Sequence, residues 1–172
     1  YAFQRQRFWP APAAAGTGDV TAVGIESAGH PLLGASVELA DADQYLLTGR
    51  LTRRTHPWLA DHAVGDTVLL PGTAYVEMAL RAGDEVGCGL VEELTLQAPL
   101  VVAEDDTVTL QVWVGAPDTA GRRPLTVSSR PQGATDAPWT RHATGTLGDT
   151  QAAPASARED GALAVWPPEG AD

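Results

Sequence analysis

The sequence predicts an α+β domain in which one antiparallel β-sheet wraps around a single helix. Apolar and polar residues alternate along five separate runs, which is the period of half-buried strands. One segment, Thr73 to Ala82, instead has helical periodicity and contains neither Gly nor Pro. Alternating strands need a common apolar partner, and this helix is the one candidate that the sequence offers.

The strand signal is clearest at residues 107–114, where four apolar residues occupy every second position. The other runs lie at residues 45–51, 94–98, 125–127 and 139–147. Turn-forming residues at 118–121 and 131–138 separate successive runs. Short connections of this kind favour an antiparallel sheet.

The helical segment has a clear buried face. Pro71 and Gly72 mark its start, and Gly83 is placed to end it. Glu77 and Arg81 stand at i and i+4 on the other face, in the favourable order for an ion pair. The residues that share the apolar face are Ala74, Tyr75, Met78, Ala79 and Ala82.

The two ends of the chain differ in composition from its middle. Residues 1–24 begin with an aromatic, Arg-rich segment and continue into Pro, Ala and Gly, which predicts a linker. Residues 149–172 are rich in Ala, Pro, Gly and acidic residues, and we expect a flexible linker there. The compact domain is therefore expected at residues 25–148. With no initiator Met and no apolar signal region, we expect a piece of a longer cytoplasmic chain.

Composition excludes several classes of function. The net charge is −11, and all 11 basic residues are Arg, so the chain should repel nucleic acid. No apolar run reaches the roughly 18 residues that a membrane span requires. A single Cys excludes an internal disulfide and a Cys-rich metal site. We therefore expect no metal, no membrane and no nucleic-acid partner.

One of the four His residues stands out as a candidate catalytic group. His30, His56 and His142 are expected to be structural or solvated. His62 precedes Pro71-Gly72 by nine residues, so its loop can fold back beside the start of the helix. Free backbone N–H groups and the positive end of the helix dipole lie there. A base beside such an oxyanion site suits proton abstraction α to a carbonyl. The apolar residues Val64, Leu69 and Leu70 should favour its neutral ring.

Several stretches, in order, resemble one family. The run from His62 to Ala74 resembles the HxxxGxxxxP motif of polyketide synthase dehydratase domains. The segment Tyr1 to Trp9 is similar to the end of the linker that follows an acyltransferase. Four further stretches resemble other parts of the same half-domain: His30-Pro-Leu-Leu-Gly-Ala35, Trp58-Leu-Ala-Asp-His62, Glu93-Leu-Thr-Leu-Gln-Ala-Pro99 and Trp139-Thr-Arg-His-Ala-Thr-Gly145.

The resemblance implies a specific fold and reaction. The fold would be a hotdog, here the first half of a double hotdog. The enzyme would remove water from a 3-hydroxyacyl thioester on an acyl carrier protein, with His62 as the general base and the Gly72 N–H holding the thioester carbonyl. The second hotdog would supply an Asp from a DxxxQ-like motif, so this chain alone should be inactive. The implied motif and pocket residues are Trp58, Leu59, Gly65, Asp66, Leu69, Leu70 and Pro71.

The resemblance also implies partners. These are an acyl carrier protein in the same polypeptide, the C-terminal hotdog half, and a second copy of the synthase in a homodimer. No cofactor is expected, because the phosphopantetheine arm belongs to the carrier and serves as a substrate handle. Asp61 could orient the loop beside His62. The remaining nearby acids are expected to form a solvated rim: Glu92, Glu93, Glu104, Asp105 and Asp106.

One departure from the motif leaves alternatives open. Asp66 stands where the motif has Gly, a residue that often supplies a positive φ, although Gly65 next to it could take over the turn. The chain could therefore be a degenerate dehydratase half with a structural role in its module. A free-standing single-hotdog thioesterase or hydratase is the other alternative, and the segment Tyr1 to Trp9 argues against it.

Overall fold

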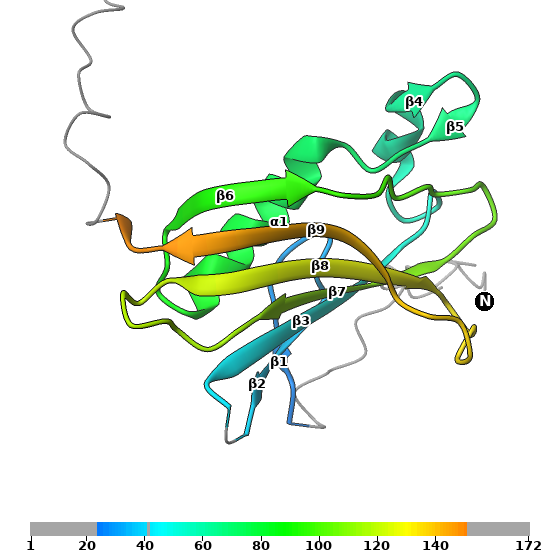
Figure 1. The fold of residues 1–172 in the computed structure, drawn as a ribbon. Helices are drawn as coiled ribbons and strands as arrows, with labels where there is room; N and C mark the ends of the chain where they lie inside the picture. Colours follow the sequence, from blue (N-terminus) through cyan, green and yellow to red (C-terminus); the bar gives the residue numbers. More distant parts are fainter. Residues whose placement is uncertain (1–23, 41, 151–172) are drawn as a thin grey trace, which may run out of the picture.

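The structure, a computed structural model, describes residues 24–40 and 42–150. The linkers predicted at residues 1–24 and 149–172 lie almost entirely outside these ranges. Figure 1 shows one large sheet curled around α1 (Gly72–Glu85), the architecture that the periodicity predicts. The strands of this sheet are β1 (Glu26–Ser27), β2 (Ala35–Leu39), β3 (Gln44–Leu51), β6 (Leu90–Leu96), β7 (Val108–Val114), β8 (Arg123–Pro131) and β9 (Thr140–Gly148). A 3-10 helix, η2 (Pro57–Asp61), and a small hairpin of β4 (Ala63–Val64) and β5 (Thr67–Val68) complete the described elements.

The main sheet is antiparallel throughout, with strand order β1-β2-β3-β7-β8-β9-β6. All five predicted runs fall on strands, namely β3, β6, β7, β8 and β9, although the run at residues 94–98 extends two residues past the end of β6. Strict alternation in β7 places Val108, Leu110, Val112 and Val114 in the core and leaves the intervening residues half-buried. The sequence predictions did not include β1, β2 or the β4–β5 hairpin.

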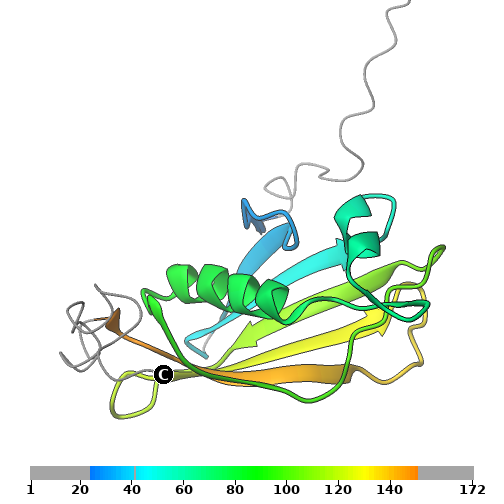
Figure 2. The same cartoon turned by 90° about the horizontal axis from the view of Figure 1, so that it is seen from above.

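Helix α1 lies across the concave face of the sheet, as the view in Figure 2 makes clear. All five residues predicted for its apolar face are buried, and Met78, Ala79 and Ala82 are fully so. They pack with the inward-facing residues of the strands in one hydrophobic core. No helix in the described part of the chain is long and apolar enough to cross a membrane.

The end of α1 corrects one prediction. The helix does not stop at Gly83 but continues to Glu85, and Gly87 then adopts a left-handed conformation with φ of 69°. The Cys88 N–H donates to the Gly83 carbonyl at 2.9 Å and the Gly87 N–H to the Asp84 carbonyl at 3.5 Å, which is a Schellman motif. Gly83 is needed for another reason: a Cβ there would lie 2.2 Å from the Cys88 carbonyl oxygen.

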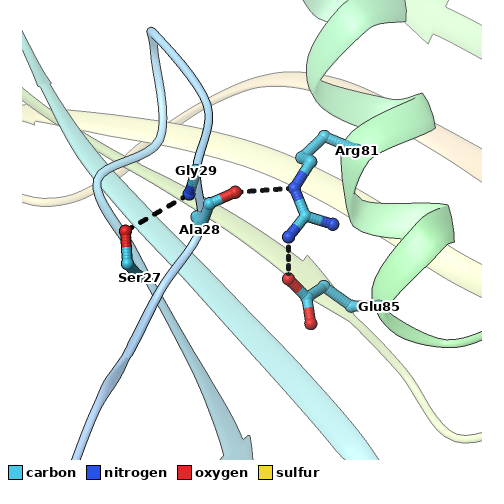
Figure 3. A network of polar contacts seen from close by, with 5 residues as sticks. All are labelled: Ser27, Ala28, Gly29, Arg81 and Glu85. Atoms are coloured by element: carbon cyan, nitrogen blue, oxygen red, sulfur yellow. Dashed lines mark hydrogen bonds and ion pairs between the residues drawn. The ribbon is translucent and has the colours of Figure 1, made fainter. Parts of the chain in front are cut away.

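The predicted pairing of Arg81 with Glu77 is also wrong. Arg81 instead forms an ion pair with Glu85, one turn further along the helix, and its Nε donates to the Ala28 carbonyl at 2.7 Å. Figure 3 shows how this guanidinium joins α1 to the loop after β1. Arg81 therefore fixes the N-terminal loop against the helix, and does not stabilise the exposed face.

His30 lies in the same region and is buried without full hydrogen bonding. Its Nδ1 accepts a hydrogen bond from the Leu32 N–H at 3.2 Å, so a neutral ring carries its proton on Nε2. Within residues 24–40 and 42–150, Nε2 has no hydrogen-bond partner, and Glu77 Oε1 lies 3.8 Å from it. Burial lowers the pKa of His30 below its usual 6.5, with a smaller lowering from Arg81 and an opposing effect of Glu77.

This geometry predicts that acidification below about pH 6.5 destabilises the fold. In that range the unfolded chain binds a proton at position 30 more readily than the folded chain does. The free energy of unfolding therefore decreases as the pH is lowered. Protonation would also break the hydrogen bond from Leu32. Urea unfolding at pH 7.5 and 5.5 should show a larger loss of stability in the parent than in His30→Asn, whose amide oxygen can still accept from Leu32. Equal losses in the two proteins would contradict this prediction.

Candidate active site

An apolar pocket of about 320 Å3 opens beside the start of α1. Three parts of the chain form it: the segment around the β4–β5 hairpin, the first turn of the helix, and the end of β6 with the residues that follow. A larger, polar hollow of about 400 Å3 lies between β2, β3 and the end of α1, but no His lines it. The residues that line the apolar pocket are His62, Leu69, Leu70, Tyr75, Leu96, Gln97, Ala98 and Pro99.

His62 is held in a defined orientation by its own loop. It follows η2, and its N–H donates to the Leu59 carbonyl at 3.0 Å. Across the hairpin, the Leu69 N–H donates to the His62 carbonyl at 3.1 Å, and His62 Nδ1 lies 2.9 Å from the Leu69 carbonyl oxygen. A carbonyl only accepts, so Nδ1 carries the proton of the neutral ring. Nε2 therefore keeps its lone pair and is the atom that can act as a base.

The hairpin that carries His62 accommodates Asp66 without strain. Val64 pairs with Thr67, so Gly65 and Asp66 form a two-residue turn. Gly65 has φ of 59°, whereas Asp66 is not among the residues with positive φ. A Gly at the first central position is typical of a type II′ turn, as found in tight hairpins. The positive φ of this turn thus falls on Gly65, and Asp66 does not have to adopt one.

The first turn of α1 supplies backbone donors beside the pocket. Pro71 caps the helix in an extended conformation, and its carbonyl accepts from the Ala74 N–H at 3.0 Å. The amides of Gly72 and Thr73 precede any possible intrahelical acceptor. A Cβ on Gly72 would lie 3.5 Å from Leu96 Cδ1, which places this amide next to the pocket wall. The helix start can therefore stabilise negative charge there.

His142 holds the opposite wall of the pocket in place. It is buried on β9, and its Nδ1 donates to the Ala98 carbonyl at 3.0 Å. With the proton on Nδ1, Nε2 accepts from the Ser129 hydroxyl at 2.7 Å. The Gln97 N–H in turn donates to the His142 carbonyl at 2.8 Å. His142 is thus structural, as predicted, but it also positions the residues after β6 that face His62.

The structure brings together some of the predicted site residues and not others. His62, Leu69 and Leu70 line the pocket, and Pro71 and Gly72 begin the helix at its edge. Neither Pro71 nor Gly72 is among the residues that line the pocket. The other four predicted residues do not line it either: Trp58 is 42% exposed, Leu59 is in the core, and Gly65 and Asp66 form the exposed turn.

Two features of the pocket differ from the sequence analysis. Val64 is 67% exposed and the His62 ring is also exposed in this chain, so Val64 does not contribute to an apolar shell around it. The wall from Leu96 to Pro99 was not predicted to line the site, although it falls within a stretch that resembles the family. Tyr75 was assigned to the core by helical periodicity alone, and it lines the pocket as well.

Comparison with known proteins identifies this arrangement. A family model described as the polyketide synthase dehydratase domain matches residues 30–130. Polyketide synthase GfsA of Streptomyces halstedii is 58% identical over 171 residues, which is 99% of this chain and 2% of that protein. The pikromycin polyketide synthase component PikAII of Streptomyces venezuelae is 56% identical over 178 residues, which is 100% of this chain and 4% of that protein.

Solved structures agree on the fold. The dehydratase domain from the terminal module of the rifamycin polyketide synthase aligns with a TM-score of 0.77 at 47% identity, over 87% of this chain and 53% of that one. A dehydratase studied for substrate selection in the borrelidin and fluvirucin synthases gives 0.75 at 51% identity, over 89% and 52%. The chain therefore spans about half the length of these dehydratases. With its helix-in-sheet fold, it belongs to the polyketide synthase dehydratase family as the N-terminal hotdog half.

Proposed function

We propose that the protein containing this chain removes water from a 3-hydroxyacyl thioester on an acyl carrier protein and gives a 2-enoyl thioester. The observation that carries the proposal is the orientation of His62. Its Nδ1 proton is committed to the Leu69 carbonyl, so the basic Nε2 is left for the substrate in an apolar pocket beside free helix amides.

The elimination can be followed atom by atom. His62 Nε2 takes the proton from C2 of the acyl group, and the electron pair of that C–H bond moves toward the thioester carbonyl. The Gly72 N–H, at the positive end of the helix dipole, stabilises the negative charge on the carbonyl oxygen. The C3–O bond then breaks as the C2–C3 double bond forms, and the departing hydroxyl takes a proton from an acid and leaves as water.

That acid is proposed to come from the second half of the dehydratase. No carboxylate from the described residues lines the pocket. Because the chain spans about half of the solved dehydratases, an Asp of the C-terminal hotdog is the proposed donor. The reaction as written needs neither a metal nor an organic cofactor. The carrier protein, the C-terminal hotdog and a second copy of the synthase remain the proposed partners.

A product assay tests the proposed function against the thioesterase alternative. The intact dehydratase is incubated with a 3-hydroxyacyl thioester on its carrier protein, and the mass of the carrier-bound acyl group is measured by mass spectrometry. Dehydration lowers its mass by that of one water and leaves the thioester intact. Release of the free 3-hydroxy acid with no enoyl product would reject the proposal in favour of a thioesterase.

Replacement of Gly72 by Pro is expected to lower the dehydration rate by about 10²–10³, the usual cost of losing one oxyanion donor. Position 72 is the first residue of the helix, where Pro is well tolerated, and the extended Pro71 suits a following Pro. The substitution thus deletes the N–H while preserving the helix start. The rate constant is measured at saturating substrate.

The matched control is Gly72→Ala. Its Cβ would make only an ordinary contact with Leu96 Cδ1, and it keeps the N–H. We expect a rate within a few-fold of the parent. Equal activity of the Pro and Ala variants, both folded by circular dichroism, would remove the Gly72 amide from the mechanism.

A further inference from the structure

Tyr75 carries a buried hydroxyl that the fold itself does not use. It lies on the inner face of α1, is 2% exposed, and lines the pocket with His62. Within residues 24–40 and 42–150, no protein group has hydrogen-bonding geometry to its hydroxyl oxygen. The Leu100 backbone exerts a weak hydrogen-bonding effect that lowers the pKa of the phenol, but it does not have the geometry of a regular hydrogen bond.

An unpaired hydroxyl in this position is costly to the folded protein. Burial without a partner forfeits the hydrogen bonds that water would make, and Phe would fill the same space without that loss. Buried polar groups in native proteins are nearly always paired, so the exceptions call for a ligand or a functional role. The hydroxyl of Tyr75 is such an exception, and the side chain that carries it lines the pocket.

The chemistry of the phenol restricts the role to that of a donor. Burial raises the pKa of Tyr75 to about 12, and the Leu100 backbone opposes this rise only in part. The group therefore stays protonated at any physiological pH. A neutral O–H in a largely apolar pocket suits an uncharged oxygen acceptor.

The position of Tyr75 on the helix points its side chain toward the reacting centre. It follows Gly72 by three residues, so the two lie on the same side of α1. Side chains on a helix lean toward its N-terminus, and this brings the ring toward the first-turn amides. Among the described residues that line the pocket, the polar side chains are those of His62, Tyr75 and Gln97.

We propose that the Tyr75 hydroxyl donates a hydrogen bond to an oxygen of the bound acyl thioester and so determines how the acyl chain is placed against His62. This inference rests on the proposed function, because it takes the 3-hydroxyacyl thioester as the ligand. Two oxygens of that ligand can accept, the thioester carbonyl and the 3-hydroxyl. An acyl thioester without the 3-hydroxyl keeps the carbonyl acceptor and lacks the other one, so the two possibilities can be distinguished.

The test measures binding to the intact dehydratase in a His62→Ala background, so that no turnover occurs. The probes are butanoyl and 3-hydroxybutanoyl thioesters of pantetheine, titrated by calorimetry into the parent and into Tyr75→Phe. Tyr45→Phe is the matched control: it loses the same hydroxyl from a half-buried ring on β3 that does not line this pocket. Thermal midpoints of all three proteins are recorded without ligand.

We expect Tyr75→Phe to bind about 5- to 10-fold more weakly, in keeping with the loss of one neutral hydrogen bond. Its thermal midpoint should equal or exceed that of the parent, because an unpaired buried group is removed. Tyr45→Phe should bind like the parent. Weaker binding of both probes assigns the contact to the carbonyl, and weaker binding of the 3-hydroxy probe alone assigns it to the 3-hydroxyl.

Two results would overturn the inference. Unchanged binding of both probes would mean that the hydroxyl does not touch the ligand. Weaker binding together with a lowered midpoint would mean that the hydroxyl has a protein partner in the intact enzyme. Both differ from failure of the proposed function, which would appear as the absence of enoyl product when the unsubstituted dehydratase is given a 3-hydroxyacyl thioester.

Discussion

Replacement of His62 by Ala is expected to reduce enoyl formation by at least ~10²-fold, the lower end of what a general base contributes. The loss follows from geometry, because no other His lines the pocket within the described residues. The intact dehydratase carrying this substitution should leave the 3-hydroxyacyl group unchanged on its carrier protein. The measurement is the initial rate of enoyl thioester formation, followed by mass spectrometry of the acyl-carrier species.

Two controls separate loss of the base from loss of the fold. The His62 ring is exposed in this chain and makes one side-chain hydrogen bond, so the thermal midpoint of His62→Ala should stay close to that of the parent. Glu104→Gln changes an exposed side chain that does not line the pocket and should keep the parent rate. Parent-like enoyl formation by the His62→Ala protein would reject the assignment of the base.

The fold was predictable wherever the sequence is periodic over several residues. Strand β7 and helix α1 each repeat their apolar pattern long enough to be identified from the periodicity of the sequence. Strands β1 and β2 give no such signal. β1 has two residues, and β2 buries Ala35 and Ser36 in succession, so both depend on pairing with β3 and its neighbours. Tertiary contacts of that kind are not visible in a local pattern.

Two predictions about the helix were wrong because they considered only spacing along the helix and not tertiary packing. Gly83 looks like a helix terminator, yet close approach of the Cys88 carbonyl explains it, and Gly87 makes the left-handed turn. The spacing of Glu77 and Arg81 suits an ion pair, but Arg81 can reach both Glu85 and the Ala28 carbonyl. The second arrangement adds a tertiary contact, which a helical spacing rule does not consider.

The site was predictable as far as its contributions are local in the chain. His62, Leu69 and Leu70 stand within nine residues of one another and meet through a short hairpin. The wall from Leu96 to Pro99 reaches the pocket because β6 pairs with β9 and the buried His142 holds Ala98. Nothing in the spacing of these residues reveals that contact. The role of the Tyr75 hydroxyl was equally hidden, because helical periodicity treats an aromatic on the inner face as core.

A second large effect is expected when this chain is assayed without the rest of the dehydratase. Departure of the 3-hydroxyl needs an acid within hydrogen-bond reach, and general acid assistance contributes about 10²–10⁴-fold. The described residues place no carboxylate around the pocket. The chain alone should therefore form enoyl product more slowly by about that factor than the same chain extended through the C-terminal hotdog. Initial rates with one 3-hydroxyacyl pantetheine thioester measure the difference.

The exposed apolar side chains of this half point to the same outcome. Leu96 is 52% exposed at the pocket rim, and Val76 and Leu80 lie exposed one turn apart on α1. If the second hotdog covers these residues, the pocket loses water and the helix amides act in a medium of lower dielectric constant. The chain alone should then also self-associate through this surface in analytical ultracentrifugation, and the extended protein should do so less. Comparable rates in both proteins would mean that residues 1–172 hold their own acid, supplied across a homodimer, and the assignment of the acid to the second hotdog would have to be abandoned.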